Sequence, residues 1–349
     1  MKHQHPHSAF GTAILTISLI LIAVVSFLSC NVPGEKYGIE IFAEPDSVFL
    51  PEYASLFRVE YYGNDKLLII HNPWGQGDYD SIFVKKEEIP IQNVLVLSSV
   101  QMAFVNELDE LESVMGIADS SYTCNIDVLN KVRSGKLIQF GDEANLSIEQ
   151  IIQYSPDIIC KSGWKEWQPV EKKMTSLGFK LVRTVEWMEN TPLGRAEWIY
   201  FFASFYGKEE LADSIFSSIA KKYNVIASSS RNQNSGIILH GWERNGAWYI
   251  PGSESYITSF YKDLDLNVFV LPESGQGSST ISRETIMGIS DSVTTWIIHD
   301  LNDTILYCDY FSDWMKNIKA VSTARVFMNL KQKGNGLSNN YWEQGTVHP

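Results

Sequence analysis

Apolar residues in the second, larger part of the chain are spaced as in a parallel α/β protein. Val94-Leu95-Val96-Leu97 is short and wholly apolar, which is typical of a strand covered on both faces. The segment that follows, 100–111, repeats apolar residues at helical spacing. The same alternation predicts further strands at 114–117, 137–140, 156–160, 180–185, 236–240 and 295–298, and further helices at 126–133, 148–154, 254–263, 283–290 and 312–319. Strands that alternate with helices predict βαβ units and a parallel sheet.

A long helical pattern divides this alternation into two. Apolar residues recur at helical spacing across 195–227, with Gly207 as the one weak point. We therefore predict an N-terminal α/β lobe over 91–192, a single connecting helix over 193–228 and a C-terminal α/β lobe over 229–349.

The first part of the chain has a different pattern. Two runs rich in β-branched and aromatic residues, 57–62 and 67–70, lie on either side of the turn Gly63-Asn64-Asp65. This arrangement indicates a β-hairpin. We predict a small N-terminal β-hairpin subdomain over 53–90.

The first thirty residues contain an apolar run from Ala13 to Leu28 that ends at Ser29-Cys30. The run is shorter than the roughly 20 residues that a membrane span needs, and a small residue precedes Cys30 as at a cleavage site. Phe27-Leu28-Ser29-Cys30 resembles a bacterial lipobox. This resemblance implies a signal peptide over 1–29, lipidation of Cys30 and a lipid-anchored linker over 30–52. An uncleaved anchor, or a signal peptide with an unrelated cysteine, remains an alternative; in each case the body of the protein lies outside the cytoplasm.

Composition excludes some partners. The formal net charge is −13, so nucleic acid is not an expected partner, whereas a basic protein surface is. The remaining cysteines, Cys124, Cys160 and Cys308, do not have the spacing of a zinc site. We expect buried thiols, and a single disulfide remains an alternative.

Five stretches in the second part carry a family resemblance. They are Asn145-Leu146-Ser147-Ile148-Glu149 with Pro156-Asp157-Ile158-Ile159, then 191–198, 248–252, 281–284 and 340–345. In this order they resemble the substrate-binding proteins of bacterial ABC importers for metal chelates, namely iron–siderophores, haem and cobalamin. The resemblance implies two mainly parallel lobes joined by one long helix. It also implies a monomeric, periplasmic, non-enzymatic receptor that passes its ligand to an ABC permease in the inner membrane. Because the family continues for one more helix, the C-terminal lobe is expected to be truncated.

The resemblance also implies how the receptor docks. The family offers one glutamate per lobe to arginines of the permease, and the matching positions are Glu149 and Glu284. An exposed carboxylate on each lobe can fix the register on a basic rim. Each glutamate also falls in the first turn of a predicted helix, where the helix dipole alone favours a negative charge.

Candidate ligand residues are those that follow strands or lie near the junction of the lobes, because two-lobed proteins bind ligands there. Hydroxyls at a helix N-terminus suit an anionic chelate, aromatic faces suit a macrocycle or a catecholate, and a guanidinium suits a carboxylate. The candidates are Ser98, Ser99, Trp164, Trp187, Arg195, Trp242, Trp248, Tyr249 and Tyr310. Helix capping, core packing and an ion pair between the lobes are the alternative roles.

Other functions have weaker support. A zinc or manganese receptor needs several converging ligands, and only His240 and His299 follow strands of one lobe. An enzyme is not expected, because there is no Gly-x-Ser-x-Gly or His-Glu-x-x-His motif. The glycine-rich stretch 275–279 lacks a P-loop lysine and is predicted to be a loop at the edge of the cleft. A glycan-binding surface lipoprotein would use the tryptophans, but the α/β pattern does not favour it. No resident cofactor or metal is predicted.

Overall fold

The computed structural model describes residues 44–141, 146–229, 236–244, 246–298, 311–328 and 339–349. The predicted signal peptide, Cys30, His299, Cys308 and Tyr310 lie outside these residues. Residues 43–349 form one compact unit.

An antiparallel sheet opens the described chain, with strand order β1-β2-β3-β4. The predicted hairpin is confirmed: Tyr62 pairs with Asp65 around Gly63, whose φ of 63° is a left-handed conformation that favours glycine. β1 falls in the stretch expected to be a linker, so the sheet begins upstream of the predicted boundary at residue 53. The strands are β1 (Ser47–Phe49), β2 (Phe57–Tyr62), β3 (Asp65–His71) and β4 (Asp78–Val84).

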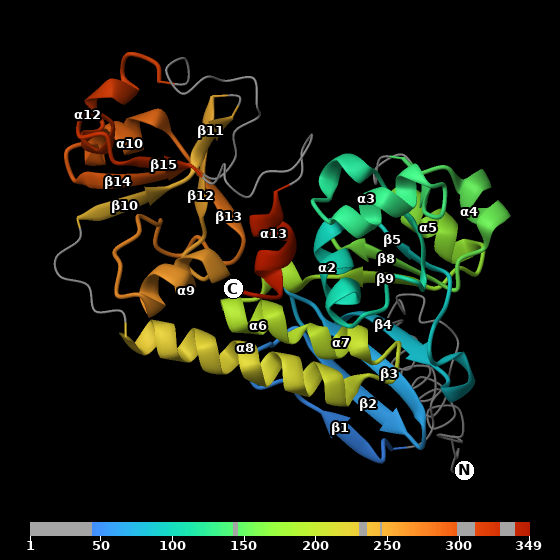
Figure 1. The fold of residues 1–349 in the computed structure, drawn as a ribbon. Coiled ribbons are helices and arrows are strands. Elements are labelled where there is room, and N and C mark those ends of the chain that lie inside the picture. The colour runs from blue at the N-terminus through green and yellow to red at the C-terminus, as the bar shows by residue number, and fades with distance from the viewer. Residues whose placement is uncertain (1–43, 142–145, 230–235, 245, 299–310, 329–338) are drawn as a thin grey trace, which may run out of the picture. The chain divides into compact units, whose positions relative to one another are not determined.

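The first lobe is built on a parallel sheet of five strands, as the pattern predicts, in the order β7-β6-β5-β8-β9 (Figure 1). The strands are β5 (Val94–Val96), β6 (Val114–Ile117), β7 (Ile138–Gln139), β8 (Ile158–Ser162) and β9 (Leu181–Thr184). The helices of this lobe are α2 (Ser99–Glu107), α3 (Ile126–Arg133), α4 (Ile148–Tyr154) and α5 (Pro169–Ser176). Because all five strands are parallel, their carboxyl ends share one edge of the sheet.

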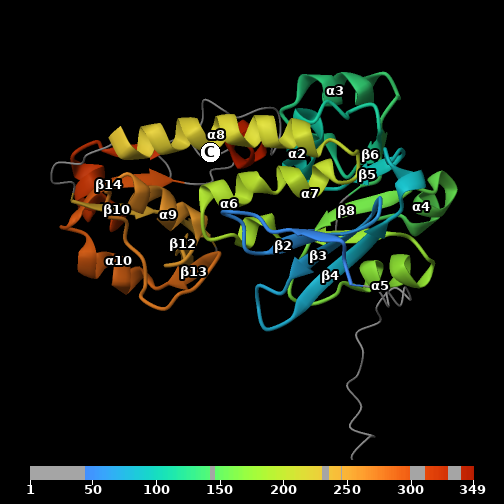
Figure 2. The same ribbon diagram turned by 90° about the horizontal axis from the view of Figure 1, so that it is seen from below.

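The connecting segment is three helices rather than one: α6 (Pro192–Glu197), α7 (Ile199–Ala203) and α8 (Glu209–Ser229). The long helix exists, with 21 residues, but it begins at Glu209. Gly207, with a φ of 67°, adopts a left-handed conformation that a continuous helix cannot contain. Figure 2 shows α8 lying alongside α6 and α7. The helical spacing of apolar residues therefore continues past residue 207, although the helix itself is interrupted there.

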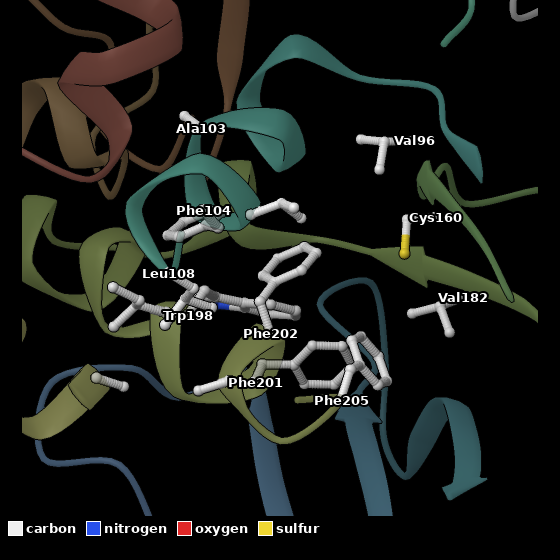
Figure 3. Close-up of a cluster of buried hydrophobic side chains, with 14 of the residues drawn as sticks. Val96, Ala103, Phe104, Leu108, Cys160, Val182, Trp198, Phe201, Phe202 and Phe205 are labelled. Carbon is white, nitrogen blue, oxygen red and sulfur yellow. The ribbon is translucent and has the colours of Figure 1, made fainter. Parts of the chain in front are cut away.

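One hydrophobic core joins the N-terminal sheet, the first lobe and the connecting segment (Figure 3). Phe202 of α7 stacks on Phe104 of α2 at 5.0 Å between ring centroids, and Phe57 of β2 lies 5.0 Å from Trp198. The buried rings of α7 therefore fix the N-terminal sheet to the first lobe.

The second lobe combines two small sheets. Its parallel sheet has the order β10-β14-β15, and an antiparallel sheet, β11-β12-β13, was not predicted. The strands are β10 (Ile237–His240), β11 (Trp242–Arg244), β12 (Ala247–Pro251), β13 (Ser278–Ile281), β14 (Val293–Ile298) and β15 (Val326–Met328). The helices are α9 (Tyr256–Asp263), α10 (Arg283–Ile289) and α12 (Lys319–Ser322). Short 3₁₀ turns are η1 (Lys86–Glu88), η2 (Ser120–Tyr122), η3 (Glu186–Met188) and η4 (Met315–Asn317).

The last described segment packs on the first lobe. It contains α13 (Asn340–Glu343) and the 3₁₀ turn η5 (Gln344–Thr346). The buried carboxylate of Glu343 accepts hydrogen bonds from the Thr123 hydroxyl and the Cys124 amide, each at 2.6 Å. Val347 belongs to the core of the first lobe. The predicted range of the C-terminal lobe, 229–349, is therefore corrected: residues 339–349 belong to the first lobe by their packing.

Candidate functional site

The carboxyl edge of the first lobe brings two predicted ligand residues together. Strand β8 lies between β5 and β9, so the residues that follow these strands are neighbours. The rings of Trp164 and Trp187 lie 5.1 Å apart, and the Trp187 indole N–H donates to the Gly163 carbonyl at 3.3 Å. Trp164 is 51% exposed and Trp187 is half-buried, so both rings offer surface to a ligand.

The two predicted serines lie at the same edge. Ser98 caps α2 with extended backbone, but its hydroxyl makes no capping hydrogen bond, and both Ser98 and Ser99 are half-buried. One turn further on, the Gln101 amide donates to the Thr184 hydroxyl at 2.8 Å. This bond ties the start of α2 to the end of β9.

The N-terminal sheet adds residues that the sequence analysis missed. Trp74, between β3 and β4, lies 6.2 Å from Trp187, and Tyr79 of β4 donates its hydroxyl to the Trp164 carbonyl at 2.6 Å. A tryptophan in a turn between two predicted strands was the available signal, because large rings are seldom left in an exposed loop without a partner. That signal does not identify the residues that the Trp74 ring contacts.

In the second lobe, neighbouring residues have different roles. Trp242 and Tyr249 stack across β11 and β12 at 5.7 Å, and both are half-buried. Trp248 is fully buried and its ring lies 5.1 Å from that of Trp296. Successive side chains of a strand point to opposite faces, so Tyr249 and Trp248 cannot both face a ligand. The prediction that Trp248 contacts the ligand is wrong; it is a core residue.

Arg195 is a packing residue of the junction between the lobes. It is only 6% exposed, its guanidinium lies 4.0 Å from the ring centroid of Tyr256 on α9, and it donates to the Thr346 hydroxyl at 2.9 Å. The partners are a ring and a hydroxyl rather than the carboxylate of a ligand. In this structure Arg195 joins α6, α9 and η5 and is not open to a ligand.

The glycine-rich loop of the second lobe meets the edge that carries Trp187. A Cβ atom at Gly277 would lie 3.7 Å from the Trp187 ring, and Gln276 donates to the Asn190 side chain at 2.7 Å. The loop 275–279 thus lies against the residues that follow β9, and its place at the edge of a ligand cleft stays a prediction.

A separate hollow of about 370 Å³ lies beside the N-terminal sheet and α8. It is lined by Phe49, Tyr61, Tyr200, Ser204, Glu209, Glu210 and Asp213. None of the predicted ligand residues lines it, so it is distinct from the edge described above.

With this geometry in place, comparison with known proteins identifies the family. Residues 94–327, well over half of the chain, match the family model of the periplasmic binding proteins. The chain belongs to this family.

Curated relatives of this periplasmic binding protein come from Methanocaldococcus jannaschii. One uncharacterized lipoprotein is 27% identical over 271 residues, which is 74% of this chain and 62% of that protein. A second uncharacterized lipoprotein is 26% identical over 208 residues, covering 56% of this chain and 52% of its own. The chain thus spans less than two thirds of the length of these relatives.

Solved structures share the fold. The triscatecholate siderophore-binding protein FeuA from Bacillus subtilis, in complex with ferri-bacillibactin, aligns with a TM-score of 0.56 at 17% identity, covering 77% of this chain and 92% of that one. The periplasmic haem-binding protein HutB of Vibrio cholerae aligns with a TM-score of 0.55 at 13% identity, covering 73% and 96%. At these identities the likeness establishes the fold of a two-lobed binding protein.

The two predicted docking glutamates occupy equivalent positions in their lobes. Glu149 lies in the first turn of α4 and Glu284 in the first turn of α10, and a serine, Ser147 or Ser282, caps each helix. Both carboxylates are exposed. The backbone amide of Glu284 and the Ser282 hydroxyl lower the pKa of the Glu284 carboxyl, which keeps it charged. Docking to a permease stays a prediction.

Within the described ranges no three His, Cys, Asp or Glu side chains come together as a metal site. His240 is buried with its Nδ1 2.7 Å from the Tyr261 hydroxyl, and burial lowers its pKa to about 4. Cys160 is a buried thiol, as predicted, and burial raises its pKa to about 12. Of the helices in the described part of the chain, none has the length and hydropathy of a membrane span.

Proposed function

We propose that this protein is an extracytoplasmic receptor that binds a metal chelate between its two lobes and delivers it to an ABC permease. The chelate is an iron–siderophore, haem or cobalamin. The observation that carries the proposal is the pair Trp164 and Trp187, which is partly open at the carboxyl edge of the first lobe and borders Gly277 of the second. Membership of the periplasmic binding proteins, and the siderophore and haem ligands named for structures of the same fold, support this choice.

The aromatic edge suits the recognition of a chelate. Two indole rings supply a large apolar area and lose little side-chain entropy on binding. Such rings can contact a macrocycle or the aryl arms of a siderophore without reacting with it. The receptor is therefore expected to bind one chelate per chain and to release it unchanged.

The anchor of the receptor is proposed to be Cys30. Lipidation of this cysteine would hold the protein at the membrane, and the two lipoprotein relatives support the assignment. Replacing Cys30 with serine is expected to abolish the incorporation of a radiolabelled fatty acid into the protein. Incorporation that the replacement leaves unchanged, or that is absent from the wild type, would contradict the assignment.

Calorimetric titration of the detergent-purified protein with haem, cobalamin and ferric siderophores tests the binding function. One chelate is expected to bind with one-to-one stoichiometry and to be recovered intact. A folded protein that binds none of these chelates would contradict the proposal. Titrations with Zn²⁺, Mn²⁺ and oligosaccharides would then distinguish the metal-ion receptor from the glycan-binding lipoprotein.

Permease docking has its own test. We expect Glu149→Lys and Glu284→Lys to lower uptake of the chelate by cells at least about tenfold when combined, because each places a cation against a basic rim. The affinity for the chelate should not change, since neither residue lies at the aromatic edge. Asp127→Lys, at an exposed position in the first turn of α3, is a matched control for the change in charge. Equal losses in all variants, or none, would contradict docking through these glutamates.

A further inference from the structure

The turn between β3 and β4 holds a tryptophan in a defined position. The Asn72 side chain accepts a hydrogen bond from the Trp74 amide at 3.0 Å, and the Asn72 amide donates to the Gly77 carbonyl at 3.0 Å. These bonds close the turn on itself. The Trp74 ring is half-buried and lies 5.3 Å from Tyr79 and 6.2 Å from Trp187.

Strand β4 is hydrogen-bonded to the carboxyl edge of the first lobe. Asp80 of β4 accepts a hydrogen bond from the Arg183 amide of β9 at 3.2 Å. The Tyr79 hydroxyl bonds the Trp164 carbonyl, and a Cβ atom at Gly163 would lie only 2.8 Å from that hydroxyl. The backbone that carries Trp164 is therefore held by the N-terminal sheet, with β4 beside β9 (Figure 1).

A buried cation lies beneath these rings. The Arg183 guanidinium is 3.5 Å from the ring centroid of Trp167 and 4.2 Å from that of Tyr79, and the side chain is 1% exposed. Asp80 and Glu171 lie 3.6 and 3.7 Å from it. The positive charge is thus paired inside the protein, and it fixes the Tyr79 ring by a cation–π contact.

Four rings form a continuous group, which we name the aromatic wall; in spatial order they are Tyr79, Trp74, Trp187 and Trp164. The centroids of neighbouring rings in this order are 5.3, 6.2 and 5.1 Å apart, within the range of direct aromatic contact. Two of the four rings come from the N-terminal sheet, which lies outside the stretch that matches the family model. Trp187, which lies between Trp74 and Trp164 in the wall, borders the second lobe at Gly277.

We infer that the N-terminal sheet supplies half of the ligand-binding wall and makes the receptor selective for chelates with flat aromatic rings. This inference rests on the proposed function and adds the ligand class and the role of residues 44–84. Stacking is the interaction that the wall offers, because the Arg183 cation beneath it is buried against Asp80 and Glu171. Catecholate arms and a porphyrin both present such rings, whereas an aliphatic hydroxamate chelate does not.

The test uses the detergent-purified full chain and three ferric probes: haem, a tris-catecholate and an aliphatic tris-hydroxamate. Trp74→Leu is expected to weaken binding of the ring-bearing probe about tenfold or more. Trp74→Phe, which keeps a ring, should restore most of the affinity. Trp314→Leu, at a half-buried position in the second lobe, should leave the affinity unchanged. Circular dichroism of each variant confirms that it is folded.

The possible binding results either support or overturn the role of the N-terminal sheet in ligand binding. Weakening that Trp74→Phe rescues and that is confined to ring-bearing probes supports the inference, and the probe that binds distinguishes a porphyrin from a catecholate. Binding that Trp74→Leu leaves unchanged, or an equal loss with the hydroxamate, overturns the inference while the proposed function stands. If the folded wild-type protein binds no probe, the proposed function fails and the inference fails with it.

Discussion

The two lobes differ in where they place the tryptophans of their sheets. In the first lobe Trp164 and Trp187 lie at the surface of the sheet edge, above a core of aliphatic residues, phenylalanines and the buried Trp198 that precedes α7. In the second lobe Trp248 and Trp296 are fully buried against each other. The second lobe has small three-stranded sheets, and a small core gains most from large side chains. A tryptophan after a strand therefore indicates a ligand-binding residue only where its ring is not part of the hydrophobic core of the lobe.

The sharpest test of this difference is the loss of one tryptophan from each lobe. Trp248→Ala is expected to lower the free energy of unfolding by about 3–5 kcal/mol, because it leaves a large cavity. Trp164→Ala should cost less than about 1 kcal/mol, since about half of the surface of this residue is in solvent. Chemical unfolding followed by circular dichroism measures both. Similar losses in the two variants would remove the contrast between the lobes.

Trp248→Phe is the matched control. Among the described residues, the indole N–H of Trp248 has no hydrogen-bond partner, so phenylalanine loses volume but no hydrogen bond seen there. Its loss of stability should fall well below that of Trp248→Ala. If the two replacements cost the same, filling of the core would not be the role of this ring.

Acid should affect the second lobe through His240. Its pKa is about 4 in the folded protein, below the ordinary value of 6.5, because burial disfavours the charged ring. A histidine with a depressed pKa contributes stability above pH 6.5 that is lost as the pH falls toward 4. The contribution is about 3 kcal/mol. His240→Gln should therefore lose about 3 kcal/mol less than wild type between these pH values, as measured by chemical unfolding. Equal losses would contradict the burial of a neutral imidazole.

The contact of residues 339–349 with the first lobe gives a smaller expected effect. Glu343→Ala leaves the Thr123 hydroxyl and the Cys124 amide without the acceptor they have in the structure. We expect a loss of about 2 kcal/mol, and Glu343→Gln, which keeps one acceptor oxygen, should lose less. Hydrogen exchange at residues 120–125 should become faster in Glu343→Ala. No change in exchange would contradict the packing of the last segment on this lobe.

Much of the fold follows from local sequence pattern. The turn at Gly63 and the apolar strands of the first lobe are predictable because neighbours along the chain decide them. Gly207 was recognised as a weak point, but the break there was not predicted, because α7 and α8 keep the apolar spacing of one helix while the backbone turns. The return of Glu343 to Thr123 was missed because the two residues are 220 positions apart and neither carries a local signal.

The candidate site was predictable only in part. Parallel strands place Trp164 and Trp187 at one edge, so their meeting follows from topology. Trp74 joins them through the contact of β4 with β9, which no periodicity reveals. For Trp248 and Tyr249, which are adjacent in β12, the sequence does not say which residue faces the core. That choice depends on how the two small sheets pack.

The central claim is that the ligand binds at the aromatic edge of the first lobe and not among the tryptophans of the second. Tryptophan fluorescence of the full chain, titrated with the chelate that calorimetry selects, tests it most directly. Saturable quenching is expected in wild type and in Trp314→Phe, and it should be largely lost in the double variant Trp164→Phe, Trp187→Phe. Quenching that persists in the double variant with unchanged amplitude and affinity would place the ligand elsewhere and contradict the account.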